Sequence, residues 1–141
     1  MSLRKLSIGA VIVLLAYFAL DCSDYHKTCL NIAIKGFAKD NPSKVSLGAY
    51  MVVDSKNVDI VLSFKDAALP DLISALQEKN PLIVAQSAYC LECLKAKQAL
   101  PEIQKVRERF DRIPTPRTPS EEYAIERIDG YLRAVKNDFK D

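Results

Sequence analysis

The sequence predicts an all-α fold in which short helix pairs stack into an α-solenoid, preceded by an N-terminal apolar helix. Two internal repeats carry this prediction. Residues 41–50 read N-P-x-x-V-x-x-x-A-Y, and residues 80–89 repeat that pattern 39 residues later. Residues 68–72 read A-L-P-D-L, and residues 99–103 read A-L-P-E-I, 31 residues on. Similarity at fixed periods of this size indicates stacked supersecondary units, none of which buries its apolar face alone.

The composition favours helices and gives no sign of a nucleic-acid-binding protein. A chain of 141 residues is long enough for one domain with a real core, and four Gly and no Trp favour helix over sheet. The net charge of +2 is too small to indicate a nucleic-acid partner by itself. No small-molecule substrate is evident, and we predict no cofactor.

The N-terminus is predicted to be a signal peptide or membrane anchor over residues 1–22, ahead of a helical repeat domain over residues 23–138. Arg4 and Lys5 precede an apolar run over residues 6–20, which is typical of both kinds of segment. The run is shorter than the about 20 residues of a spanning helix. Positive charge before it and Asp21 and Asp24 after it favour an extracytoplasmic, periplasmic or membrane-anchored location for the rest of the chain.

The fate of this segment stays open at the sequence level. Cleavage after Ala19 places Tyr17 where signal cleavage favours a small residue. Cys22 follows the run as a lipidated cysteine does, but Asp21 stands where a small residue belongs. The alternatives are therefore an uncleaved anchor, an atypically cleaved signal, lipidation at Cys22, or a first buried helix of a soluble fold.

Apolar periodicity and capping residues predict the helices of the first half. A helix begins near Thr28, with apolar residues at i, i+3, i+4 and i+7, and ends before Asn41. Asn41 is expected to cap the next helix and Pro42 to open it. Residues 58–64 are expected to form a short helix, because a lone strand between helices has no partner. Asp66 is expected to cap the helix that follows.

The second half is predicted in the same way. Asn80 is expected to cap a helix over residues 81–94, and another helix is expected over residues 99–110. A proline-rich linker over residues 113–119 follows. Thr118 and Glu121 form a capping box for a last helix that ends near residue 137 and caps the solenoid. Its predicted inward face is Ile125, Ile128, Leu132 and Val135.

Residues 67–106 resemble a HEAT repeat of the short bacterial kind related to the phycobilisome-lyase HEAT-like repeats. One helix reads A-L-P-x-L-I-x-x-L, the connector x-N-P, and the partner helix V-x-x-x-A-Y-x-L-x-x-L. The resemblance implies about three HEAT-like helix pairs in a small right-handed α-solenoid. It also implies a protein-binding scaffold without catalytic residues, because the matched positions are packing positions.

Residues with reactive side chains are predicted to be structural. Cys90 and Cys93 lie within one predicted helix, so two packing cysteines are favoured over a redox or zinc motif. Cys22 and Cys29 are close enough for a disulfide only if their segment is not helical. The single histidine, His26, is expected at a solvated helix entry, and no metal or catalytic site is predicted. Tyr50 and Tyr89, at equivalent repeat positions, are expected to pack.

The leading functional hypothesis is a non-enzymatic protein-binding scaffold, exported or membrane-anchored, that docks another protein. The alternative is a structural subunit of a membrane or envelope complex without a free ligand groove. An enzyme would need a nucleophile–base pair or a metal cluster, and the sequence indicates neither. Basic residues mixed with acidic ones form either a solvated face or a recognition strip for an acidic partner or lipid headgroups. The residues of this strip are Lys105, Arg109, Arg112 and Arg117.

Overall fold

The computed structural model describes the backbone of residues 8–40 and 55–140 and the side chains of residues 22–40 and 55–140. These residues form helices and connecting turns without a strand, which confirms the all-α class. The predicted helix that Asn41 and Pro42 begin, including Tyr50, lies outside the described residues. The α-helices are α1 (Ile8–Gly36), α2 (Lys56–Ser63), α3 (Leu69–Ala75), α4 (Pro81–Cys93), α5 (Leu100–Asp111) and α6 (Pro119–Lys136). Short 3₁₀ helices are η1 (Phe37–Lys39), η3 (Lys65–Ala68) and η4 (Lys97–Ala99).

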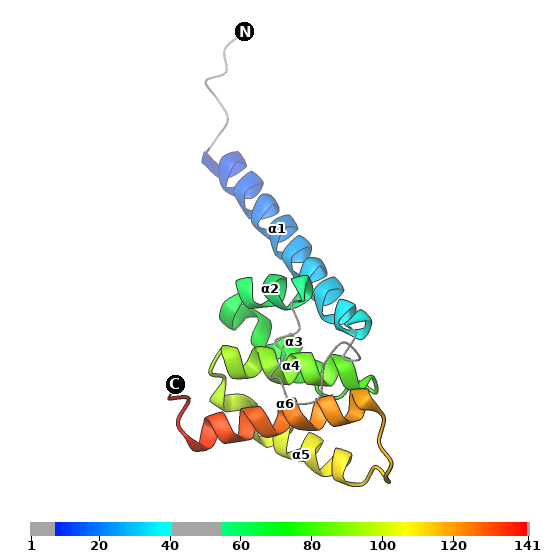
Figure 1. The fold of residues 1–141 in the computed structure, drawn as a ribbon. Coiled ribbons are helices and arrows are strands. Elements are labelled where there is room, and N and C mark those ends of the chain that lie inside the picture. The colour runs from blue at the N-terminus through cyan, green and yellow to red at the C-terminus, as the bar shows by residue number, and fades with distance from the viewer. Residues whose placement is uncertain (1–7, 41–54, 141) are drawn as a thin grey trace.

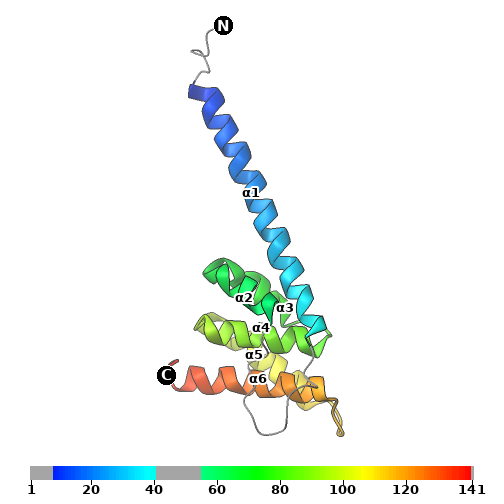
Figure 2. The ribbon, with the colours of Figure 1, turned by 45° about the horizontal axis from the view of Figure 1, so that its top comes forward.

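Helix α1 is longer than predicted, because it begins at Ile8 instead of near Thr28. No Gly or Pro occurs between Gly9 and Gly36, so nothing in the sequence breaks the helix. The predicted boundary between residues 22 and 23 therefore falls inside one element. Figures 1 and 2 show the N-terminal half of α1 extending away from the other helices, while its C-terminal part packs beside α2.

The side chains of the apolar run over residues 6–20 lie outside those described. Among the residues whose side chains the structure describes, no helix is long and apolar enough to cross a membrane.

Helix α4 is the centre of the body. It lies between α3 and α6 and also contacts α1, α2 and η1, and its contact with α6 is the most extensive of any helix pair (Figure 1). One stripe of α4 is buried at Val84, Ser87, Ala88 and Leu91. Residues 82, 83, 85 and 86, on other sides of α4, are buried as well, because neighbours cover the helix almost all round. Small side chains at Ala85, Ser87 and Ala88 allow this close approach.

Within residues 55–140, three helix starts are capped by side chains. Asn80 Oδ1 accepts from the Leu82 amide at 2.9 Å, and Thr118 with Glu121 forms the predicted capping box. Ser55 caps α2 by accepting from the Val58 amide at 3.3 Å. The prediction for Asp66 was wrong. Asp66 lies inside η3, and α3 begins after Ala68 without a side-chain cap, because the 3₁₀ turn delivers the chain directly into the α-helix.

Helix α6 presents a different face to the core than its sequence predicts. Ile128 is buried as expected, but Ile125, Leu132 and Val135 are only half-buried. Tyr123, Ala124 and Tyr131 complete the buried face. The aromatic rings at two of these positions turn α6 toward α4, and the Tyr131 hydroxyl donates to the Ala96 carbonyl at 2.5 Å.

Candidate functional site

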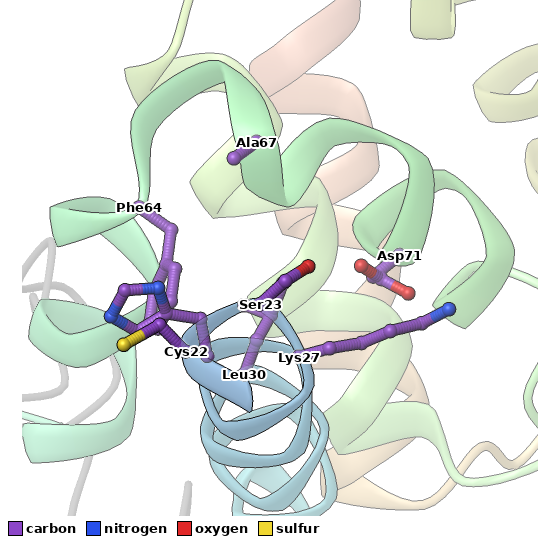
Figure 3. Close-up of a pocket in the computed structure, with 8 residues that line it drawn as sticks. Cys22, Ser23, Lys27, Leu30, Phe64, Ala67 and Asp71 are labelled. Atoms are coloured by element: carbon purple, nitrogen blue, oxygen red, sulfur yellow. The ribbon is translucent and has the colours of Figure 1, made fainter. Parts of the chain in front are cut away.

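A pocket of about 450 Å³ lies between α1 and the segment that leads into α3 (Figure 3). Helix α1 contributes a row of polar side chains because Cys22 and His26, and Ser23 and Lys27, are each four residues apart and share a face. The opposite wall is mainly apolar, with Asp71 at one end. The lining residues are Cys22, Ser23, His26, Lys27, Leu30, Phe64, Ala67 and Asp71.

The two ends of the pocket differ in character. At one end the His26 ring meets the Phe64 ring edge-on, with centroids 6.0 Å apart and planes at 81°. At the other end, Figure 3 shows the Lys27 side chain extending toward Asp71. His26 is exposed, as predicted, but it lies well inside α1 instead of at a helix entry. The pocket thus has one aromatic end and one end with a positive and a negative side chain, Lys27 and Asp71.

The cysteines do not form disulfides with one another: Cys22, Cys29, Cys90 and Cys93 are all free. Cys22 and Cys29 both lie in α1, where seven residues of helix separate them by about 10 Å along the axis. Their segment is therefore helical, and the disulfide that a non-helical segment would allow is not formed. Burial raises the pKa of the Cys90 thiol, whereas Cys93 is exposed on another side of α4. In the described part of the chain, no group of three or more His, Cys, Asp or Glu side chains could hold a metal ion.

The structure does not gather the predicted basic strip into one free surface. Lys105 Nζ is 2.6 Å from Glu102 Oε1, one helical turn away on α5. The Arg109 guanidinium donates to the carbonyls of Leu76 at 3.0 Å and Glu78 at 3.2 Å, beyond the end of α3. Arg117 donates to the Phe110 carbonyl at 3.5 Å, and Arg112 is exposed where α5 ends. Two of the four cations thus bind backbone carbonyls of the fold at half-buried positions.

We expect Arg109→Ala to lower the free energy of unfolding by about 1–2 kcal/mol, because carbonyls that follow α3 lose a charged donor. Lys105→Ala, on the same helix, removes an exposed ion pair and should change stability by less than about 0.5 kcal/mol. Urea unfolding followed by circular dichroism compares the two variants. Equal effects would mean that Arg109 has no special role in joining α5 to α3.

Sequence reasoning missed a polar network at the centre of the body. Gln86 is 1% exposed, and its Nε2 donates to Asp40 Oδ2 at 2.7 Å. Its Oε1 accepts from the Tyr123 hydroxyl at 3.1 Å, so one side chain of α4 links the residue that follows η1 to α6. The signal in the sequence was a glutamine inside an apolar stretch of α4, since buried polar groups need partners.

A cation–aromatic cluster adjoins that network. The Arg127 guanidinium lies 4.9 Å from the Tyr89 ring centroid and 5.1 Å from the Tyr123 ring centroid. Arg127 is therefore half-buried between two aromatic rings. Burial raises the pKa of Tyr89 to about 12, and its ring packs against the core. The cluster strengthens the α4–α6 contact from the outside.

Comparison with protein-family models, with curated proteins and with solved structures found no match.

Proposed function

We propose that this chain is a non-enzymatic helical scaffold that the N-terminal half of α1 holds at a membrane and whose body docks another protein. One observation carries the proposal. Helix α1 is continuous from Ile8 to Gly36, and its last turns belong to the core through Leu30, Ala33 and Ile34. The same helix carries the apolar run away from the body (Figure 2). A membrane segment and a folded body joined without a hinge would move as one unit.

The length of the apolar part of α1 limits how it can insert. From Ile8 to Leu20 the helix rises about 18 Å at 1.5 Å per residue, compared with a hydrocarbon core of about 30 Å. The apolar run is therefore short for a span. Arg4 and Lys5 before it have long side chains that reach a membrane surface from a buried backbone. Because this positive charge lies before the run, the N-terminal end is expected on the cytoplasmic side and the body on the extracytoplasmic side.

The body supports the scaffold part of the proposal. Helices α3 and α4 pack against each other, and α6, which follows α5, packs along α4 (Figure 1). We propose that these layers form a short right-handed HEAT-like solenoid, with α6 as its terminal helix. In such repeats the stacked helices build an extended surface for a partner. Two parts of the body offer polar groups to a partner: the pocket beside α1, and the side of α5 that exposes Gln104, Lys105 and Glu108.

A second candidate is a structural subunit of a membrane or envelope complex. The engagement of Arg109 and Arg117 with backbone carbonyls favours it, because these cations serve the fold itself. Purification in mild detergent separates the two candidates. A stoichiometric membrane assembly supports the subunit, and a partner that exchanges from the body supports the scaffold.

The membrane proposal predicts that Leu15→Arg releases the protein from membranes. An arginine in the middle of an inserted helix costs about 3 kcal/mol. Leu15→Ala keeps the run apolar and is the matched control. The measurement is the fraction of chain that sediments with native membranes after a carbonate wash. Wild type and Leu15→Ala should sediment, and Leu15→Arg should not.

Intact mass of the wild-type protein in each fraction completes this test. The full chain mass in membranes supports the uncleaved anchor. A chain that begins near Cys22 and is heavier by acyl groups establishes lipidation instead. A truncated, unmodified chain in the soluble fraction establishes secretion, and a full-length soluble chain contradicts the membrane proposal altogether.

A further inference from the structure

The pocket beside α1 holds two opposite charges that do not pair with each other. Lys27 reaches one end of the pocket from α1, and Asp71 reaches the same end from the first turn of α3 (Figure 3). Among the ion pairs of residues 22–40 and 55–140, none joins these two side chains. Lys27 is exposed and Asp71 is half-buried, so both charges remain accessible to a ligand. This end of the pocket therefore offers one cation and one anion together.

The lining of the pocket limits what such a ligand can be. A ligand with only a negative charge would be attracted by Lys27 but repelled by Asp71, and a ligand with only a positive charge would meet the reverse. Leu30, Ala67 and Phe64 supply the apolar part of the lining. The volume of about 450 Å³ lies within the range of about 300–1,000 Å³ that is usual for small-molecule sites. The chemistry that fits is a small zwitterion whose two charges are joined by a short carbon chain.

The position of the pocket along α1 indicates where that zwitterion comes from. Cys22 is two residues beyond Leu20, the last residue of the apolar run, and Lys27 is seven residues beyond it. Because α1 is one continuous helix, these residues lie about 3 Å and about 10 Å past the end of the run. A bilayer of about 40–45 Å with a hydrocarbon core of about 30 Å has a headgroup layer of about 5–8 Å on each side. With the run inserted, the pocket lies at the level of the lipid headgroups.

The surroundings of the pocket agree with a position at a membrane surface. Tyr25 lies in the same stretch of α1 and is 69% exposed. Tyrosine is enriched at membrane–water interfaces, where its ring meets apolar and polar surroundings at once. Figure 2 shows α2 and α3 as the layer of the body nearest to the projecting half of α1, and α2 exposes Ile60. The wall of the pocket opposite α1 belongs to this layer.

We propose that the pocket beside α1 binds the headgroup of a phosphatidylethanolamine molecule, with the phosphate on Lys27 and the ammonium on Asp71. The proposal rests on the proposed function, because the lipid reaches the pocket only when the run is in a membrane. This headgroup carries a primary ammonium two carbons away from its phosphate, so it supplies both charges of the required zwitterion. A bound headgroup would fix the height and the orientation of the body above the membrane.

The same two side chains distinguish this lipid from other common lipids. A primary ammonium has three N–H donors for the Asp71 carboxylate, as a lysine ammonium has. The trimethylammonium group of phosphatidylcholine has no N–H donor. Phosphatidylglycerol offers a phosphate to Lys27 but brings no cation to Asp71. We therefore expect both of these lipids to bind more weakly.

The first experiment measures lipid retention by the full-length protein in mild detergent, using native mass spectrometry. Phosphatidylethanolamine, phosphatidylcholine and phosphatidylglycerol with the same acyl chains are added in turn at equal concentration. The protein should retain phosphatidylethanolamine about tenfold more than either of the others, as expected for one additional charge-assisted contact. Equal retention of the three lipids overturns the proposal.

Variants with matched controls assign the preference to the pocket. Asp71→Asn should remove the preference for phosphatidylethanolamine over phosphatidylcholine, and Lys27→Gln should weaken both lipids alike, because both carry the phosphate. Asp59→Asn, in the first turn of α2, and Lys35→Gln, in the last turn of α1, make the same chemical changes outside the pocket and should behave as wild type. A retained helical circular dichroism signal shows that each variant is folded. Pocket variants that keep the wild-type preference, or controls that lose it equally, overturn the proposal.

Protection of a thiol tests the site in a bilayer. Cys22 lines the pocket, Cys90 is buried, and serine at positions 29 and 93 removes the other two thiols. In nanodiscs that contain phosphatidylethanolamine, a maleimide should modify Cys22 at least about fivefold more slowly than in nanodiscs of phosphatidylcholine alone. Asn31→Cys, in a background that also has serine at position 22, is exposed outside the pocket and should react equally in both.

The outcomes separate this proposal from the membrane proposal. A chain that does not enter nanodiscs contradicts the membrane proposal, and with it the lipid source of the ligand. A chain that enters them and shows equal Cys22 rates in both contradicts the headgroup proposal alone. Protection by soluble glycerophosphoethanolamine, without protection in phosphatidylethanolamine bilayers, means that the pocket binds a free zwitterion and likewise overturns the headgroup proposal.

Discussion

Tyr131→Ala is expected to lower the free energy of unfolding by about 3–5 kcal/mol, as for other large aromatic side chains removed from a core. Tyr131 is fully buried and is the largest of the fully buried side chains that the structure describes. Its ring packs edge-on to Phe139, with centroids 5.9 Å apart, and its hydroxyl holds the Ala96 carbonyl before η4. Urea unfolding of the full chain measures the change. A loss below about 1 kcal/mol would contradict this position for Tyr131.

Tyr131→Phe is the matched control, and it separates the hydroxyl from the ring. Removing one hydrogen bond to a backbone carbonyl should cost about 1 kcal/mol. Burial raises the pKa of Tyr131 to about 12, above its ordinary value of 10. Between about pH 10 and 12 the unfolded chain therefore releases this proton before the folded chain does, and stability falls as pH rises. Tyr131→Phe should make that fall shallower, without abolishing it, because the pKa of Tyr89 is raised in the same direction.

Gln86→Leu is expected to lower the free energy of unfolding by about 2–3 kcal/mol, although it adds apolar surface to the core. The substitution removes the donor to Asp40 and the acceptor for the Tyr123 hydroxyl together. Buried polar groups left without partners cost more than a lost hydrogen bond alone. Chemical denaturation of the single variant gives the value. A neutral or stabilising effect would show that this network contributes specificity without net stability.

A double-mutant cycle sharpens that test. Tyr123→Phe removes the hydroxyl that Gln86 accepts from, so the Gln86→Leu and Tyr123→Phe double variant no longer leaves that hydroxyl unpaired. The double variant should lose about 0.5–1 kcal/mol less free energy of unfolding than the two single variants lose in sum. Strict additivity would mean that the two side chains do not interact in solution.

Local sequence signals predicted the parts of the fold that neighbouring residues along the chain decide. The capping box of Thr118 and Glu121 and the cap at Asn80 are both present. Each depends on atoms no more than three residues apart, so a motif is sufficient to predict it. Asp66 shows the limit of this reasoning, because the chain enters α3 through a 3₁₀ turn that the cap rule does not include.

The candidate site was less predictable, because its contacts join distant segments. Arg109 was expected on an exposed strip, but it reaches carbonyls about thirty residues away in sequence. The pocket forms where α1 passes the segment before α3, and no motif connects those two stretches. Lys27 is an intermediate case. Its place on one face of α1 with Ser23 is present in the sequence, but only the packed body brings Asp71 to the same end of the pocket.

The sequence by itself determined that the chain is helical, where most of its helices lie and which residues cap two of them. Those properties follow from backbone propensity, apolar periodicity and hydrogen bonds within one turn, and all of these act locally. Only the tertiary structure decided which face of α6 is buried, which cations serve the fold and where Gln86 finds its partners. Those outcomes depend on the rotation of one helix against another, and that rotation follows from how side chains of distant segments pack.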